Sequence, residues 1–368
     1  MQDSFSSKVL GWYATHGRKN FPWQRNSHAY NIWVSEIMLQ QTRVETVIPY
    51  YEKFMQHFPN VNELAAADMD EVLHLWTGLG YYARARNLHK AAQKIVDEYQ
   101  GQFPKQLDAV IALPGIGRST AAAILAMSFN QAHAILDGNV KRVLARYFAI
   151  QGWPGTKSVE QQLWQKADTL LPQNKFAEYT QAMMDLGATL CTRSNPQCSS
   201  CPVQSNCKAF AQQLQSKLPT PKPSKKIPQR KVVVAIIQNR QDNSIWLEKR
   251  PPAGIWGGLY SFPEFENTSA LEAWLKTHLK QQDEDATPTS QSLAVITHTF
   301  SHFRLHMHPR IIQIDKKPNG VMEDDLGVWY KLTDQKIGLA APVIKTLQQV
   351  LNSNKEQSHE SHGAMCEA

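Results

Sequence analysis

Hydrophobic residues recur every three or four positions through the first two hundred residues, the spacing of helices that bury one face. No stretch of this region alternates in the way that a half-buried strand does. The pattern therefore predicts a mainly α-helical region. The predicted helices cover 3–15, 32–41, 44–57, 69–77, 83–99, 107–113, 121–128, 140–149, 159–171 and 176–190.

The pattern changes near residue 230, where short apolar runs separated by polar residues indicate strands. Strands are predicted at 232–237, 245–247, 293–300, 305–314 and 328–332, and helices at 270–279 and 343–351. The C-terminal third is thus expected to form an α+β domain. The predicted organisation is a helical domain at 1–210, a basic, proline-rich linker at 211–229, the α+β domain at 230–352 and a disordered polar tail at 353–368.

Length and composition fit two folded domains, with 368 residues, 42% of them hydrophobic and 19% charged. The net charge is +7, and the segment 217–231 holds six basic residues and no acidic one. That segment can lie beside phosphate or serve only as a solvated spacer. No apolar run approaches the roughly 18 residues of a membrane span, and the first ten residues lack an export signal. We expect a cytoplasmic monomer without a membrane partner.

A Leu-Pro-Gly-Ile-Gly-Arg-Ser-Thr motif predicts a tight turn between two helices. Pro114 ends the first helix, and Gly115 and Gly117 permit a reversal that leaves backbone N–H groups uncovered. Ser119 or Thr120 is expected to open the next helix, whose positive end adds to an anion site. The pattern is typical of a helix-hairpin-helix that holds a phosphate, although an ordinary helix hairpin has the same appearance.

Two acidic residues occupy unusual positions. Glu36 shares an apolar helical face with Ile32 and Leu39, at spacings of four and three residues. Burial would raise its pKa into the range of a general acid, unless Glu36 lies at the rim of the face or pairs with a base. Asp137 follows the apolar run 132–136 and precedes a Gly-Asn pair. It is either a functional carboxylate or the N-cap of the next helix.

Four of the five cysteines fall in one short segment, separated by six, two and five residues. They are Cys191, Cys198, Cys201 and Cys207. In a cytosolic chain such a group favours metal binding over disulfides. Structural zinc sites usually combine two close pairs, whereas a compact loop of four thiolates suits an iron–sulfur cluster. Zinc and a redox disulfide remain the alternatives.

Two further segments combine aromatic and turn-forming residues. The turn 78–82 reads Gly-Leu-Gly-Tyr-Tyr and can present an aromatic ring to a base, or simply pack its tyrosines. Phe300, Ser301 and His302 form a tip between two predicted strands. This tip can reach a partner or be a plain connecting turn.

Taken together, these segments resemble the MutY family of adenine DNA glycosylases, within the helix-hairpin-helix glycosylase superfamily. The likeness rests on motifs in chain order at 34–42, 78–82, 113–120 and 137–140, on the four cysteines, and on a C-terminal domain similar to the Nudix fold. The resemblance implies a helical catalytic region with one 4Fe–4S cluster. It also implies removal of adenine opposite 8-oxoguanine or guanine in double-stranded DNA, with the adenine rotated out of the duplex.

The resemblance also assigns roles to individual residues. Glu36 matches the general acid that protonates the purine, and Asp137 the carboxylate that stabilises the cationic sugar, with Ser119 and Asn139 in support. Further matches are Gln41 and Tyr81 as wedges beside the lesion, Thr42 as a lesion contact, Gly115 and Gly117 as phosphate-holding amides, Phe300, Ser301 and His302 as sensors of oxidised guanine, and Cys191, Cys198, Cys201 and Cys207 as cluster ligands.

Three alternative functions conflict with particular residues. Endonuclease III carries a lysine nucleophile where this chain has Ser119, and a serine cannot form the Schiff base needed for strand cleavage. An active Nudix pyrophosphatase needs a glutamate-rich helix, but 270–279 offers only Glu272. A non-catalytic DNA-damage binding protein would lose Glu36 or Asp137, and both are present. We therefore predict a monofunctional adenine glycosylase.

Overall fold

The computed structural model describes residues 4–224, 226–278, 290–315, 317, 327–331 and 337–350. The predicted tail lies outside these ranges. The chain forms two compact units, the first made of Met1–Ala66 and Asn87–Ser224 and the second of Ala67–Arg86 and Lys225–Ala368. The second unit thus includes a segment from the helical part of the sequence.

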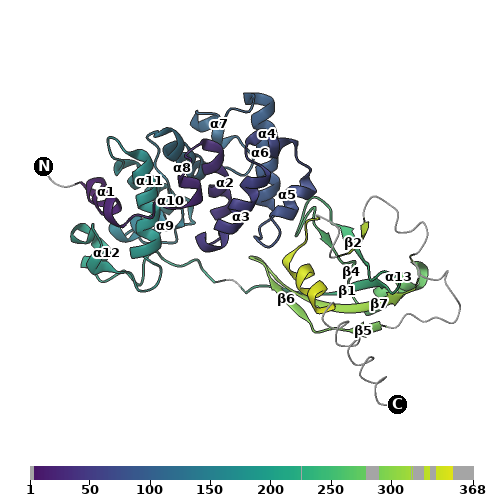
Figure 1. The fold of residues 1–368 in the computed structure, drawn as a ribbon. Helices are drawn as coiled ribbons and strands as arrows, with labels where there is room; N and C mark the ends of the chain where they lie inside the picture. Colours follow the sequence, from purple (N-terminus) through teal and green to yellow (C-terminus); the bar gives the residue numbers. More distant parts are fainter. Residues whose placement is uncertain are drawn as a thin grey trace, which may run out of the picture. The chain divides into compact units, whose positions relative to one another are not determined.

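The first unit consists of helices (Figure 1). They are α1 Phe5–His16, α2 Ala29–Leu39, α3 Val44–His57, α4 Val61–Ala66, α6 Ala83–Tyr99, α7 Leu107–Ile111, α8 Arg118–Phe129, α9 Gly138–Tyr147, α10 Lys157–Thr169, α11 Phe176–Asp185 and α12 Lys208–Ala211, with α6 beginning in the second unit. The predicted bounds of α3 and α6 are confirmed, while α4 was not predicted. In the described part of the chain, no strand precedes residue 229.

Helix α8 lies at the centre of the first unit. Six consecutive residues, 121–126, are buried, and four of them are alanines. Small side chains on all sides let α2 and α11 pack closely against this helix. The candidate residues on α2 and at the start of α9 are therefore carried by elements packed in one core.

The start of α8 differs from the prediction. The helix begins at Arg118 with Gly117 as its N-cap, so the expectation that Ser119 or Thr120 opens it is wrong. The Ser119 hydroxyl instead accepts a hydrogen bond of 2.9 Å from the backbone N–H of Leu136. Its side chain joins the hairpin to the strand-like segment before α9 rather than capping its own helix.

The segment predicted as one helix over 176–190 contains a change of helix type. Helix α11 ends at Asp185, and the chain continues as a π-helix over Leu186–Leu190. A Cβ added at Gly187 would lie 2.6 Å from the Cβ of Asn139. The π-helical turn is wider than an α-helical one, and Gly187 has no side chain. The backbone at Gly187 can therefore lie close to the start of α9.

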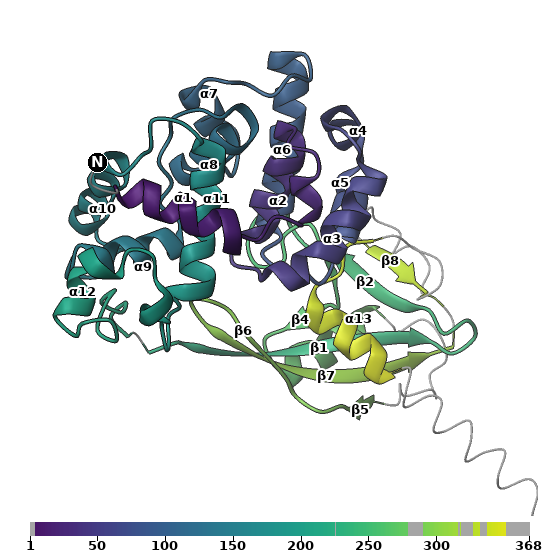
Figure 2. The same ribbon diagram turned by 60° about the vertical axis from the view of Figure 1, so that its left-hand side comes forward.

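The second unit is built on a mixed sheet of eight strands (Figure 2). The strands are β1 Gln229–Asn239, β2 Ile245–Lys249, β3 Tyr260–Ser261, β4 Glu264–Phe265, β5 Ser290–Ser292, β6 Ile296–Thr299, β7 Arg304–Ile314 and β8 Gly327–Tyr330. The main path runs β3-β2-β1-β7-β5, with β4 beside β1, β6 beside β7 and β8 beside β2. The long strands β1 and β7 are parallel, and the other pairs are antiparallel.

Both faces of the sheet are covered. Val233, Ala235 and Ile237 of β1 pack with Leu271 of helix α13, Thr268–His278. The alternate β1 residues are also buried. Residues 341–350 form a further helix, so the predicted mixture of strands and helices is confirmed. Strands β3, β4 and β5 were missed because each has only two or three residues.

Within the described ranges, none of the helices combines the length and the apolar character needed to span a bilayer.

Candidate active site

A cleft with a volume of about 710 Å³ opens in the first unit. Both Glu36 and Asp137 line it, so the structure brings together the two acids singled out by the sequence. Ser119, Thr42 and Asn139 line the same cleft. The walls come from α2 and the turn after it, the starts of α8 and α9, and the end of α11.

Glu36 occupies the one cleft-facing position of an otherwise buried stretch of α2. Its neighbours Val34, Ser35, Ile37 and Met38 are all buried. Burial raises the pKa of Glu36 to about 8, and the negative charge of Asp137 contributes to the rise. Within the described part of the chain, no donor forms a hydrogen bond to the Glu36 carboxyl. The side chain is therefore protonated near neutral pH and can release a proton into the cleft.

Asp137 is the N-cap of α9, and its side chain also lines the cleft. Its Oδ1 accepts a hydrogen bond of 2.7 Å from the Val140 backbone, and its Oδ2 accepts one of 3.1 Å from the Asn139 side chain. Burial raises the pKa of Asp137 above its ordinary value, and these donors and the positive Arg142 offset only part of that rise. An ionised Asp137 thus receives hydrogen bonds from the protein, whereas the described residues provide none to an ionised Glu36.

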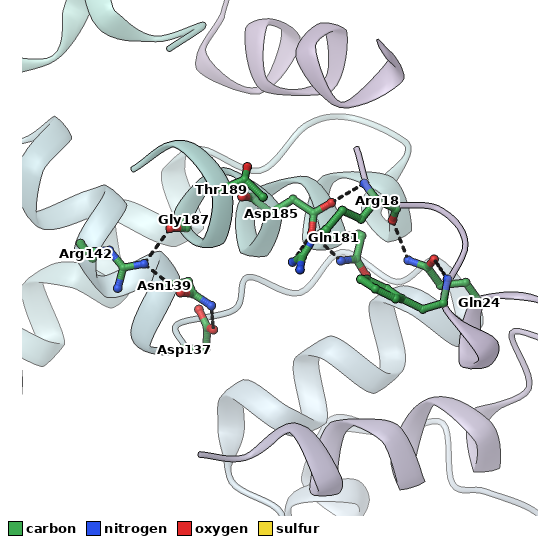
Figure 3. Close-up of polar contacts among 10 residues, drawn as sticks. Arg18, Gln24, Asp137, Asn139, Arg142, Gln181, Asp185, Gly187 and Thr189 are labelled. Carbon is green, nitrogen blue, oxygen red and sulfur yellow. Dashed lines mark hydrogen bonds and ion pairs between the residues drawn. The ribbon is translucent and has the colours of Figure 1, made fainter. Parts of the chain in front are cut away.

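Arg142 fixes the orientation of Asn139 (Figure 3). The Arg142 Nη2 donates to the Asn139 side-chain oxygen at 2.9 Å and to the Gly187 carbonyl at 2.7 Å. The Asn139 nitrogen is thereby directed to Asp137. The Arg142 Nε also donates to the carbonyl of Cys191 at 2.7 Å. Arg142 therefore connects the carboxylate, the π-helix and the first cysteine, a role that its sequence position did not reveal.

A buried acid on α11 holds two polar side chains at the cleft wall (Figure 3). Asp185 is fully buried and accepts hydrogen bonds from the backbone N–H and guanidinium of Arg18 at 2.7 to 3.0 Å. It also accepts one of 2.9 Å from Gln181. Arg18 and Gln181 both line the cleft. Asp185 shares its helical face with Gln181 as well as Ala182, so the apolar pattern that pointed to Glu36 is much weaker here.

The remaining sequence candidates divide between the two units. In the first, Thr42 lines the cleft, Gln41 is exposed with a φ of 60°, and Gly115 has a φ of 79° in the hairpin. In the second, Tyr81 is 54% exposed at the tip of its turn. Phe300 packs between aromatic rings, while Ser301 and His302 are exposed at the β6–β7 connection.

The four cysteines surround one small apolar cavity of about 30 Å³ beside the end of the π-helix. Burial and the charges of the other three thiolates together raise the pKa of Cys201 to about 11, although a hydrogen bond from the Val203 N–H lowers it. A cationic group in the cavity would remove this obstacle to ionisation.

In the described ranges, no three His, Cys, Asp or Glu side chains are placed to hold one metal ion. The cavity is lined by all four cysteines together with Arg146. Arg146 donates to the Cys191 sulfur at 3.3 Å, which favours a negatively charged sulfur.

Both parts of the chain are similar to known protein families. Residues 34–168 match the HhH-GPD superfamily of base excision DNA repair proteins, and residues 233–349 match the NUDIX domain. A solved thermostable thymine-DNA glycosylase superposes with a TM-score of 0.52 and 28% identity, over 56% of this chain and 95% of that one. The helical fold is thus that of the HhH-GPD superfamily of base excision DNA repair proteins.

Two relatives identify the branch of this superfamily. An adenine DNA glycosylase from Buchnera aphidicola subsp. Acyrthosiphon pisum is 42% identical over 94% of this chain and 97% of its own length. One from Mus musculus is 33% identical over 86% of this chain and 72% of its own. The chain belongs to the adenine DNA glycosylase family, and it is an enzyme of DNA repair.

Proposed function

We propose that the chain hydrolyses the N-glycosidic bond of adenine paired with 8-oxoguanine, and also that of adenine paired with guanine. The observation that carries the chemistry is the asymmetric pair of acids in one cleft. Glu36 is held neutral by burial, while Asp137 receives hydrogen bonds that favour its anion. This is the division of labour that glycoside cleavage requires.

In this proposal Glu36 transfers its proton to a ring nitrogen of the everted adenine, which departs as a neutral base. The sugar is left with positive charge, and the Asp137 carboxylate stabilises it across the cleft. Asn139 keeps that carboxylate in place, and water completes the hydrolysis. Ser119 supplies no amine, so the reaction ends at an abasic site without strand cleavage.

Gln181 provides a basis for the choice of adenine. Its amide N–H groups are directed to Asp185, which can only accept, so the amide oxygen is available as an acceptor at the cleft wall. Adenine presents an exocyclic amino group as a donor, whereas the corresponding atom of guanine is a carbonyl oxygen. An acceptor oxygen of Gln181 at the cleft wall therefore favours the binding of adenine over that of guanine.

We assign DNA and lesion contacts to residues outside the acid pair. Gly115 and Gly117 leave hairpin amides for a phosphate, and the exposed Gln41 and Tyr81 are placed as wedges. Thr42, Phe300, Ser301 and His302 are assigned to contact with the oxidised guanine. Cys191, Cys198, Cys201 and Cys207 would hold a 4Fe–4S cluster, which when bound cross-links their loop.

The test uses purified full-length protein and duplexes that differ only in the base opposite adenine. Alkaline cleavage after incubation reveals abasic sites, and omission of alkali reveals any strand-nicking activity. We expect adenine release opposite 8-oxoguanine and guanine, little release opposite thymine, and no nick without alkali. Equal release from all duplexes would contradict the proposed substrate.

A further inference from the structure

Residues 67–86 belong to the second unit, although they lie within the part of the sequence that matches the glycosylase superfamily. They comprise α5, Met69–Leu75, and the glycine-tyrosine turn after it. Polar contacts join both ends of the segment to the C-terminal part of the chain. Lys249 forms an ion pair of 2.9 Å with Asp70, and Arg86 donates to the Gly257 carbonyl at 2.6 Å.

The same segment is packed as closely as a domain core. Val72, Leu73 and Leu75 of α5 are buried. A Cβ added at Gly338 would lie 2.7 Å from the Cβ of Leu73, so the backbone at 337–339 is in direct contact with the helix. Figures 1 and 2 both show α5 beside the β2 end of the sheet. The C-terminal part of the chain therefore supports α5 along its length.

The turn after α5 has an unusual backbone. Gly78, Gly80 and Tyr81 all have positive φ values, of 98°, 75° and 50°. For Tyr81 this conformation is unfavourable without support from its surroundings. Trp76 and Arg84 both donate to the Gly80 carbonyl, at 3.1 and 3.0 Å. Hydrogen bonds from neighbouring residues thus stabilise the turn, and the Tyr81 ring remains largely exposed.

Leu339, far away in the sequence, also forms hydrogen bonds to the turn. The Tyr82 hydroxyl donates to the Leu339 carbonyl at 3.0 Å and accepts from the Gly78 N–H at 3.3 Å. The Leu339 N–H donates in turn to the Thr77 hydroxyl at 3.3 Å. The backbone carbonyl and N–H of Leu339 therefore form hydrogen bonds on both sides of the turn that contains Tyr81.

We propose that Thr77 and Tyr82 are positioning residues through which the C-terminal part of the chain sets the conformation of Tyr81. This inference rests on the DNA contact assigned to Tyr81 above. It assigns to the C-terminal part of the chain a second task besides contact with the lesion, namely presentation of an aromatic wedge in the conformation that enters the duplex.

The test begins with two matched variants of the full-length chain. Thr77→Val removes the hydroxyl that accepts from Leu339 with little change in volume, whereas Thr77→Ser retains it. Binding is measured on a duplex with a non-hydrolysable adenine analogue opposite 8-oxoguanine, with a fluorescent purine beside the mispair to report unstacking. We expect Thr77→Val to weaken binding and the fluorescence change by about three- to tenfold, the effect of one lost hydrogen bond, and Thr77→Ser to match the parent.

A double-mutant cycle separates positioning from general stability. If Tyr82 acts through Tyr81, then Tyr82→Phe weakens binding in the parent chain and has no further effect when Tyr81→Ala is present. Parent-like binding by Thr77→Val, or additive effects of Tyr82→Phe and Tyr81→Ala, would overturn the inference. A Tyr81→Ala variant with parent-like binding would instead overturn the DNA contact assigned to Tyr81, and the inference with it. Adenine release by the parent chain tests the proposed function independently.

Discussion

The carboxyl groups of Glu36 and Asp137 line the same cleft, and the negative charge of Asp137 adds to burial in raising the pKa of Glu36 to about 8. Each acid therefore reinforces the protonation state that the other needs. An ionised Asp137 keeps Glu36 protonated. A neutral Glu36 in turn places no second negative charge near Asp137, so Asp137 can stay ionised.

Glu36→Gln should abolish adenine release, because the amide keeps the size of the side chain and cannot donate the proton. General acid catalysis typically contributes about 10²- to 10⁴-fold, so we expect a loss of at least about 100-fold in single-turnover rate. Binding to the mispair should persist. Glu52→Gln, at an exposed position on α3, is the matched control. Near-parent turnover by Glu36→Gln would contradict the assignment of the acid.

The raised pKa of Glu36 also predicts two pH effects. The single-turnover rate should fall as pH rises through about 8, because the acid form is lost. Stability should change in the same direction. A carboxyl whose pKa is higher in the folded state binds more protons when folded, so its contribution is lost as pH rises from its unfolded value near 4.5 towards 8. Chemical denaturation should show Glu36→Gln gaining stability relative to the parent across this interval. A constant difference between the two proteins would refute the shift.

Asp185→Asn should destabilise the first unit and disturb the cleft. Its carboxylate is fully buried whereas Arg18 is 31% exposed, and loss of a hydrogen bond to a charged group typically costs about 1.5–3 kcal/mol. Gln181 would lose its fixed acceptor as well. Equilibrium unfolding measures the first effect, and release of adenine against 2-aminopurine or guanine measures the second. Asp168→Asn, which removes an exposed ion pair with Arg118, should change stability by less than about 1 kcal/mol.

Ser119→Lys should gain weak strand-nicking activity, because an amine would enter the cleft near the position expected for the sugar. The substitution also removes the acceptor of the Leu136 N–H, so some loss of stability is expected. Borohydride trapping followed by gel electrophoresis detects the covalent adduct. The complete absence of a trapped adduct, from a variant that still releases adenine, would show that the side chain does not reach the sugar.

His302→Ala should reduce discrimination between 8-oxoguanine and guanine opposite adenine. His302 is exposed at the β6–β7 connection and is not part of the cleft lining, so the chemistry on adenine should be retained. Comparing release rates from the two duplexes gives the discrimination ratio. His57→Ala, at an exposed position on α3, serves as the control. An equal loss on both duplexes would contradict a lesion-sensing role.

The sequence predicted Glu36 and Asp137 because each interrupts an apolar pattern, and such interruptions can be recognised without knowledge of the fold. The start of α8 was mispredicted because Ser119 has the residue type of an N-cap. Its true partner, Leu136, lies 17 positions away in the chain. The π-helix at Leu186–Leu190 could not be predicted from the sequence either, since its apolar spacing continues that of α11.

The assignment of 67–86 to the second unit could not be predicted from local pattern. Its helical spacing is the same whether the buried face meets another helix or a sheet. Only contacts across large sequence separations, such as Asp70 with Lys249 and Tyr82 with Leu339, decide which core it joins.

The close packing of Leu73 against Gly338 affects how truncated forms of this enzyme behave. A fragment cut within the basic, proline-rich stretch would keep α5 but lose the Gly338 backbone that packs against Leu73 and the ion-pair partner of Asp70. A change in its activity would then reflect the altered environment of α5 as well as the loss of the proposed lesion contacts. Point substitutions at the β6–β7 tip are therefore the cleaner means of dissecting lesion recognition.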